Sequence, residues 1–168
     1  MIYEAHSTDY QPAEALRNLV RDHFAILKVG PALTFAFREG VFALAMIENE
    51  LFSTDSSSNL MEILDAVMVQ HPEHWRKYYH GNEAEQAFKR KYSLSDRVRY
   101  YWSDPQIQFA LEKLLSHLNQ KPIPFSLLSQ FAPRQYQRVR RGEIENTPES
   151  ILLDCIQAVL LEYRAARY

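Results

Sequence analysis

The sequence predicts an α/β protein that opens with two strand–helix units and continues as a helical extension. Short apolar runs at residues 1–5 and 25–29 are each followed by a helical pattern that opens near a proline, at Pro12 and Pro31. After residue 59 the apolar residues recur at helical spacing, and no further strand is expected. Strand, helix, strand, helix is the unit of a parallel sheet.

The first unit is expected to be a strand over residues 1–5 and a helix that starts at Gln11-Pro12. Proline is tolerated in the first turn of a helix because its missing N–H would have no partner there. The apolar residues of this helix fall on one face. They are Leu16, Leu19, Val20 and Phe24.

The second unit is expected to be a strand over residues 25–29, broken at Gly30-Pro31, and a long helix to about residue 51. This helix is apolar on nearly every side, so we expect it to be buried or wedged between neighbours. Arg38 and Glu39 stand inside it, and buried charges are costly unless they are paired. We interpret them as part of a structural ion pair, whose partners could be residues outside this chain. Contact of Arg38 to a phosphate is the alternative.

The extension begins with a polar, serine-rich loop over residues 52–59. Helices are then predicted over residues 60–70, from Pro72 to near Gly81, and over residues 105–118. Pro122 and Pro124 mark a turn, and Thr147-Pro148 is expected to cap the last helix.

Two parallel strands do not make a stable sheet, because parallel sheets have several strands and are covered on both faces. The chain therefore resembles the last part of a larger α/β domain. We predict that residues 1–52 are its final two strand–helix units and that residues 53–168 are a helical extension. Exposed strand edges favour aggregation, so the isolated chain is expected to be poorly soluble or partly molten.

Composition and charge exclude several classes. The 168 residues are 46% hydrophobic and carry a net charge of -2, which argues against disorder and against nucleic acid as a main partner. The apolar stretch at residues 41–47 is too short to span a membrane. The single cysteine, Cys155, lies among apolar residues and is expected to be a buried thiol in a reducing compartment. We expect a cytoplasmic protein without a leader segment.

Polar side chains gather directly after the first predicted strand. They are Glu4, His6, Ser7 and Asp9. In an α/β barrel the residues just past the carboxyl end of a strand face the site, so His6 could act as a general base or a metal ligand oriented by Glu4 or Asp9. The alternative is a hydrogen-bonded loop whose polar residues cap the next helix. No second metal ligand stands at a diagnostic spacing, so no metal site is predicted.

A second candidate site lies at the turn after the second predicted strand. Gly30 lets a ligand approach the backbone, and the following helix offers free amides that suit a phosphate. Lys28 could add a charge and Thr34 a hydroxyl. Together with the first group these residues make a candidate sugar-phosphate site. The alternative is a plain strand-to-helix turn.

A third group combines guanidinium and aromatic side chains at Arg97, Arg99, Tyr100, Tyr101 and Trp102. Arginine, tyrosine and tryptophan dominate protein interfaces, so this group is a candidate partner interface. The alternative is that the aromatic residues pack the extension onto the barrel. The sequence has no Walker loop, Ser-His-Asp pattern or zinc cluster, and no catalytic residue is predicted.

Several stretches of the chain together resemble one known family. They are residues 3–11, 20–36, 92–102, 122–124, 128–131 and 133. These stretches resemble the GatZ/KbaZ family, the accessory subunits of class II tagatose-bisphosphate aldolase. The resemblance covers essentially all of the chain, and the long second stretch makes it specific. Members of the family are longer, with an α/β barrel of the TIM type ahead of this segment, so the chain resembles their carboxyl-terminal part.

The resemblance implies a non-catalytic subunit that supports a separate aldolase subunit, in a chaperone-like way. That partner would cleave tagatose 1,6-bisphosphate with zinc, in the bacterial breakdown of galactitol or N-acetylgalactosamine. No cofactor is then expected in this chain. The alternative is a sugar-phosphate-binding enzyme such as a tagatose-6-phosphate kinase, a label that the family has also carried. Changing His6 should matter little to an accessory subunit, but should abolish binding in such an enzyme.

Overall fold

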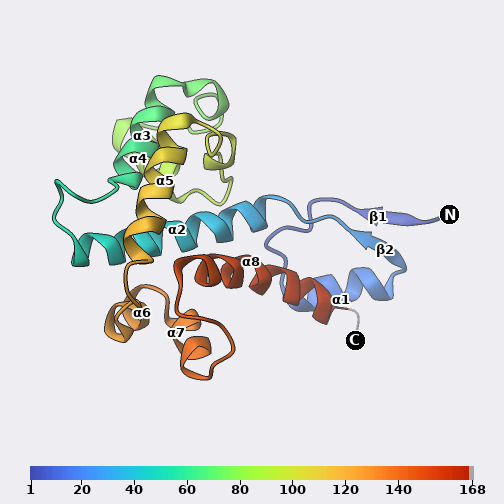
Figure 1. Cartoon of the computed structure of the whole chain (residues 1–168). Helices are drawn as coiled ribbons and strands as arrows, with labels where there is room; N and C mark the ends of the chain where they lie inside the picture. Colours follow the sequence, from blue (N-terminus) through green and yellow to red (C-terminus); the bar gives the residue numbers. More distant parts are fainter. Residues whose placement is uncertain (167–168) are drawn as a thin grey trace.

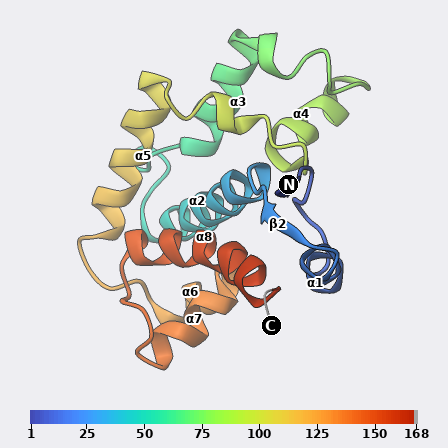
Figure 2. The ribbon, with the colours of Figure 1, turned by 90° about the vertical axis from the view of Figure 1, so that its right-hand side faces the viewer.

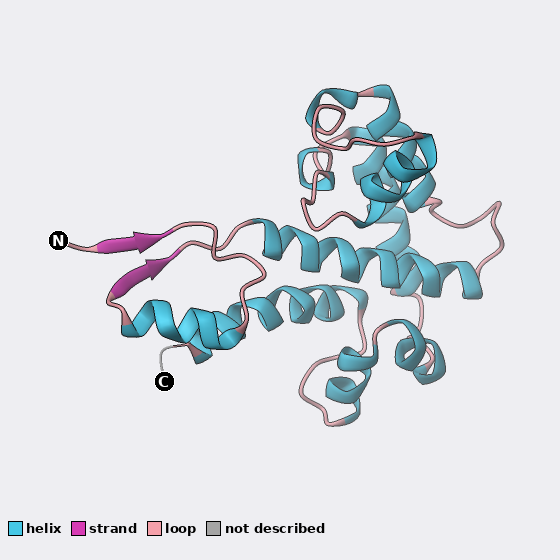
Figure 3. Cartoon of the chain, turned by 180° about the vertical axis from the view of Figure 1, so that it is seen from behind, coloured by secondary structure: helices cyan, strands magenta, loops and turns pink. Residues whose placement is uncertain are grey.

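The computed structural model describes residues 1–166 and is a mostly helical α/β fold. In that part of the chain two strands come first, and no strand follows the second (Figure 3). The elements in chain order are β1 (Tyr3–Ala5), α1 (Ala13–Arg21), β2 (Phe24–Leu27), α2 (Pro31–Leu51), α3 (Leu60–Gln70), the 3-10 turn η1 (Pro72–His74), α4 (Glu83–Tyr92), the 3-10 turn η2 (Val98–Tyr100), α5 (Pro105–Leu118), α6 (Phe125–Phe131), α7 (Pro133–Arg140) and α8 (Pro148–Ala165).

Strands β1 and β2 form a two-stranded parallel sheet at one end of the molecule, beyond the start of α2 (Figure 1). Glu4 lies opposite Ile26, and Ala5 lies opposite Leu27. Ala5 is buried, but Tyr3 and Ile26 are 52% and 46% exposed. Parallel sheets are normally covered on both faces, so this sheet leaves open surface that such sheets elsewhere bury.

Helices α2 and α8 lie side by side and run in opposite directions (Figures 1 and 3). Gly40 allows their close approach. A Cβ atom at this position would lie 2.9 Å from Leu152 Cδ2 and 3.1 Å from Cys155 Sγ. The pair forms the axis on which the other helices pack.

Helices α3, α4 and α5 lie on one side of this axis, and α6 and α7 lie on the other (Figure 2). The hydrophobic core joins the second half of α2 to residues of the extension, so α2 contributes to both predicted domains, and the boundary at residue 52 stays a prediction. The most deeply buried core residues include Val41, Leu44, Ile47, Leu60, Leu64, Ile107, Leu114, Leu128 and Ile151.

Most predicted helices are confirmed. Helices α2, α3 and α5 begin and end within a residue or so of the expected positions. Asp104 caps α5 by accepting a hydrogen bond from the Gln106 amide, and Thr147 caps α8 through the Ser150 amide. β2 ends at Leu27 instead of residue 29, because the chain there turns toward Asp9.

Three helices were missed, and one predicted helix is wrong. α4 is polar on most faces, so it has no apolar stripe to detect, although Asn82 and Glu85 form a capping box at its start. α6 and α7 are short, and their prolines cap or start helices instead of marking a turn alone. The helix expected from Pro72 to near Gly81 is a 3-10 turn followed by hydrogen-bonded turns over residues 75–78.

Candidate functional site

The structure brings Glu4, His6 and Lys28 together at the carboxyl ends of the two strands. Glu4 Oε1 lies 3.4 Å from His6 Nε2 and 3.2 Å from Lys28 Nζ. The side chains of His6 and Lys28 are mostly exposed. Sites of α/β proteins lie at this edge of the sheet. The three residues therefore form an open, charged cluster that could meet a polar ligand.

Asp9 fills the position at the start of α2 where a phosphate was expected. Its Oδ1 accepts hydrogen bonds from the amides of Gly30, at 3.0 Å, and Ala32, at 2.8 Å. The amide of Leu33 donates to Gly30 O, and the Thr34 hydroxyl donates to Pro31 O. These groups already have protein partners. The turn at Gly30 is thus a strand-to-helix connection that a carboxylate distant in the sequence holds in place, as in the alternative interpretation of this turn. In the alternative for the first group, its polar residues cap the helix that follows them, α1, but Asp9 caps α2 instead.

The loop between β1 and α1 is held in an unusual conformation. Ser7 and Tyr10 have positive φ values of 56° and 62°, which non-glycine residues adopt at a cost of about 1–3 kcal/mol each. Contacts from other elements hold them there. Thr8 donates to Lys28 O, and the Tyr163 hydroxyl at the end of α8 donates to Thr8 O at 2.8 Å. The loop after the first strand is therefore positioned by the last helix.

Tyr10 fixes the other side of the same loop. Its hydroxyl donates to Leu94 O at 3.0 Å, and its ring packs edge-on against Phe35. Burial, together with the negative charges of Asp96 and Asp9, raises the pKa of Tyr10 to about 12. Its hydroxyl consequently stays protonated and remains a hydrogen-bond donor at neutral pH.

Arg38 forms a structural ion pair, as expected, but its partner, Asp96, lies within this chain. Arg38 Nε lies 3.2 Å from Asp96 Oδ1, and both side chains are almost fully buried. The guanidinium also lies over the rings of Phe35 and Phe42. Burial raises the pKa of Asp96, and the charge of Arg38 opposes that shift. Glu39 is not part of the pair, and burial raises its pKa.

The third predicted group divides between the surface and the interior. Tyr100 is exposed, and Arg97 and Arg99 are partly exposed. Tyr101 is only 4% exposed, and its hydroxyl donates to His71 O. Trp102 packs edge-on against Phe37 of α2, with 5.0 Å between the ring centroids. Trp102 therefore joins the extension to α2, as in the alternative interpretation, and stays partly exposed, while Tyr101 is buried within the extension against His71.

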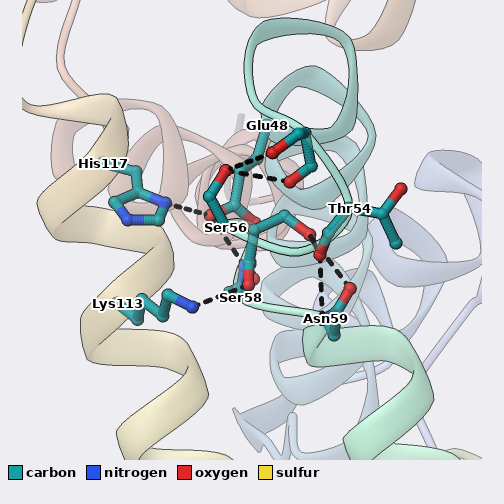
Figure 4. Close-up of polar contacts among 9 residues, drawn as sticks. Glu48, Thr54, Ser56, Ser58, Asn59, Lys113 and His117 are labelled. Atoms are coloured by element: carbon teal, nitrogen blue, oxygen red, sulfur yellow. Dashed lines mark hydrogen bonds and ion pairs between the residues drawn. The ribbon is translucent and has the colours of Figure 1, made fainter.

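Figure 4 shows a buried polar network around Glu48 that was not predicted from the sequence. Glu48 is fully buried and accepts hydrogen bonds from the Ser58 amide and hydroxyl, while its Oε1 lies 2.6 Å from His117 Nδ1. Phe52 stacks on the His117 ring. Lys113 donates to Ser57 O at 2.8 Å. The network ties the serine-rich loop to α5. The one signal for it was a carboxylate placed beside Ile47 in an apolar helix.

Cys155 lies against Gly40 of α2 and is half-buried, whereas a fully buried thiol was expected. Burial raises the pKa of Cys155 to about 11, which keeps the thiol protonated near neutral pH. Among residues 1–166, no three histidine, cysteine or acidic side chains gather as a metal site would require. In the same part of the chain, no helix has the length and apolar content needed to cross a membrane.

Comparison with known proteins identifies the group to which this chain is related. The family model described as "D-tagatose-1,6-bisphosphate aldolase subunit GatZ/KbaZ-like" matches residues 1–168. The chain belongs to the GatZ/KbaZ-like family. Similar proteins include D-tagatose-1,6-bisphosphate aldolase subunits GatZ of Salmonella paratyphi B and Salmonella newport, each 51% identical over 164 residues.

A solved structure shares this fold. It is the crystal structure of a protein described as a probable tagatose 6 phosphate kinase from Sinorhizobium meliloti 1021. The TM-score is 0.94 at 48% sequence identity, over 99% of this chain and 43% of that one. The match to the GatZ proteins covers 98% of this chain and 39% of their length. The GatZ/KbaZ-like chain thus spans about two fifths of the curated relatives that it matches.

Proposed function

We propose that this chain serves as the carboxyl-terminal part of an accessory, non-catalytic subunit of class II tagatose-1,6-bisphosphate aldolase. In this role it supports the activity and stability of a separate, zinc-dependent catalytic subunit in the cytoplasm, in a chaperone-like way. The observation that carries the proposal is the family match over residues 1–168, joined to relatives that are aldolase subunits.

The use of charged side chains inside the protein supports a structural role. Arg38 and Asp96 neutralise each other, and Glu48 holds a loop against α5. Asp154 on α8 accepts hydrogen bonds from Gln135 and Arg138 of α7. Each of these buried charges thus joins two helices or a helix and a loop, and is engaged in holding the fold together.

The open sheet supports the proposal that a larger barrel surrounds it. Tyr3 and Ile26 are large apolar side chains left exposed on the strands, and the helices and strands of a complete barrel would cover them. We propose that β1 and β2 are the last two strands of an α/β barrel of the TIM type. The helices from α3 onward would then be the extension.

The direct test is co-expression with a catalytic aldolase subunit from a galactitol-degrading bacterium. We expect the chain to copurify with that subunit and to slow the loss of its aldolase activity on warming. A full-length GatZ protein from Salmonella serves as the positive control. An unchanged rate of activity loss with the chain, together with protection by the full-length control, would contradict the proposal for this chain.

A second candidate function is sugar-phosphate binding, as in a tagatose-6-phosphate kinase. The convergence of Glu4, His6 and Lys28 at the carboxyl ends of the strands favours it. Calorimetric titration of tagatose 6-phosphate into the chain and its His6→Ala and Lys28→Ala variants separates the two functions. Binding that both substitutions abolish would support the second function, whereas an accessory subunit is expected to give no heat of binding at this cluster.

A further inference from the structure

Three cations and two tyrosine rings alternate on the surface formed by residues 77–78 and 97–100. The Arg97 guanidinium carbon lies 3.5 Å from the centre of the Tyr78 ring and 5.7 Å from that of Tyr100. Lys77 lies over the Tyr78 ring at 4.9 Å, and Arg99 lies over the Tyr100 ring at 4.7 Å. We call these five residues the arginine–tyrosine ladder.

Hydrogen bonds attach Arg97 and Arg99 of the ladder to the structure beneath it. The Tyr79 hydroxyl, on a side chain that is almost fully buried, accepts a hydrogen bond from the Arg97 amide and donates to Ser95 O. Arg99 donates to Asp96 O at 2.9 Å and to the Tyr100 hydroxyl at 2.8 Å. Side chains ordered before binding lose less conformational entropy when a partner arrives.

The ladder carries positive charge that the chain itself does not neutralise. Within residues 1–166, Lys77, Arg97 and Arg99 form no ion pair with a carboxylate, and the buried Nε of Arg97 has no hydrogen-bond partner. The buried acid next to Arg97 in the chain, Asp96, pairs with Arg38. A hydrogen bond with Lys77 and the charges of Lys77 and Arg97 lower the pKa of Tyr78, as a positive local field would.

The geometry favours carboxylates over nucleobases as the groups that bind here. Single-stranded nucleic acids stack their bases on open aromatic faces, but cations already cover faces of Tyr78 and Tyr100. A guanidinium that lies on a ring still presents its in-plane N–H groups, and these match a carboxylate in a two-point hydrogen bond. Arginine and tyrosine are also the residue types that most often dominate the energy of protein interfaces.

We propose that the arginine–tyrosine ladder is the docking surface for an acidic segment of the catalytic aldolase subunit, whose carboxylates pair with Arg97 and Arg99. This inference rests on the proposed function, because it names the part of this chain that the partner contacts. It also makes the association sensitive to salt, since exposed charge pairs are screened as ionic strength rises.

The test measures the affinity of the purified chain for the catalytic subunit at low and moderate salt. The Arg97→Ala/Arg99→Ala double variant is expected to bind about tenfold more weakly or worse and to lose most of the salt dependence. Arg140→Ala is the matched control, because Arg140 is an exposed arginine that lies over Tyr136 on α7, away from the ladder. Its affinity should equal that of the unchanged chain. Thermal unfolding of each variant shows that the fold is retained.

A second measurement keeps this inference separate from the proposed function. Synthetic peptides rich in Asp and Glu, or in Asn and Gln as a control, are titrated into the chain. Binding of the acidic peptide that requires Arg97 and Arg99 supports the ladder even if the catalytic subunit does not bind. Unchanged affinity of the double variant for the subunit overturns the ladder and leaves the proposed function standing. Preference of the ladder for a single-stranded oligonucleotide over the acidic peptide overturns it as well.

Discussion

The helices of the extension share a core of fully buried apolar side chains, although Phe88, Phe109 and Leu153 stay exposed, whereas the strands of the same chain bury only Ala5. Leu64, Leu114 and Ile151 are at most 1% exposed, while Tyr3 and Ile26 are about half exposed. A helix satisfies its backbone hydrogen bonds within itself and needs neighbours for one face only. A parallel strand needs partners along both edges and cover on both faces. The helical region is therefore built to be stable in this chain, and the sheet is not.

Helix α2 connects these two regions. Its first half follows β2 and is fixed by Asp9 and by the Arg38–Asp96 pair. Its second half lies in the core with α3, α5 and α8. The stability of the sheet end should therefore depend on polar contacts to α2, and that of the helical end on hydrophobic packing.

The largest expected effect comes from breaking the buried ion pair. Asp96→Ala leaves the Arg38 charge buried without a partner, and loss of one member of such a pair costs about 3–5 kcal/mol. Urea unfolding measures the change. The double variant Arg38→Met/Asp96→Leu should recover most of the loss, because it removes both charges together. Equal destabilisation of the single and double variants would show that packing, and not the uncompensated charge, sets the cost.

Truncating an apolar side chain to alanine should destabilise the chain much more in the helical core than in the sheet. Leu114→Ala removes a side chain with no exposure, and such substitutions cost about 2–5 kcal/mol. Ile26→Ala removes a half-exposed strand residue, and its effect should stay within about 0.5 kcal/mol. Both values come from urea unfolding followed by circular dichroism. A cost at Ile26 that matches the cost at Leu114 would mean that the sheet belongs to the cooperative core.

The smallest effect concerns Cys155 at the contact of α8 with α2. Its pKa in the folded chain, about 11, lies above the ordinary 9.0, mainly because of burial. At pH 8 the folded chain should hold about 100-fold less thiolate than the unfolded chain, and react with a thiol reagent correspondingly more slowly.

The raised pKa of Cys155 also makes the stability of the folded chain depend on pH. Because the folded chain holds this proton more tightly, the contribution is complete below pH 9 and is lost as the pH rises toward 11. Labelling rates in buffer and in urea provide the comparison, since the cysteine is the same and only the fold changes. Equal rates would show that α8 separates readily from α2.

Sequence patterns predicted those helices whose start and buried face are marked by residues close together in the chain. Helix α2 has a proline start and a continuous apolar run, and α5 and α8 have capping residues before apolar stripes. Helix α4 has no such stripe and was missed. The many charged residues of this segment are equally compatible with a packed helix and with a loop.

Contacts between residues distant in the chain could not be paired from one sequence. Asp9 was expected near a ligand site, but its partners are amides that lie more than twenty residues later. Arg38 was expected to be paired, yet nothing near it identified Asp96. The Glu48–His117 contact joins two helices that each look ordinary by themselves. The packing of α2 against the extension determines the Arg38–Asp96 and Glu48–His117 pairs.

Hydrogen exchange followed by mass spectrometry tests the contrast between the two regions most directly. The account predicts that amides in the second half of α2 and in α5 and α8 exchange with strong protection, at rates set by unfolding of the whole helical region. Amides of β1 and β2 should exchange orders of magnitude faster, through local opening of the sheet. Equal protection of the Phe24–Leu27 amides and those around Leu114 would contradict it.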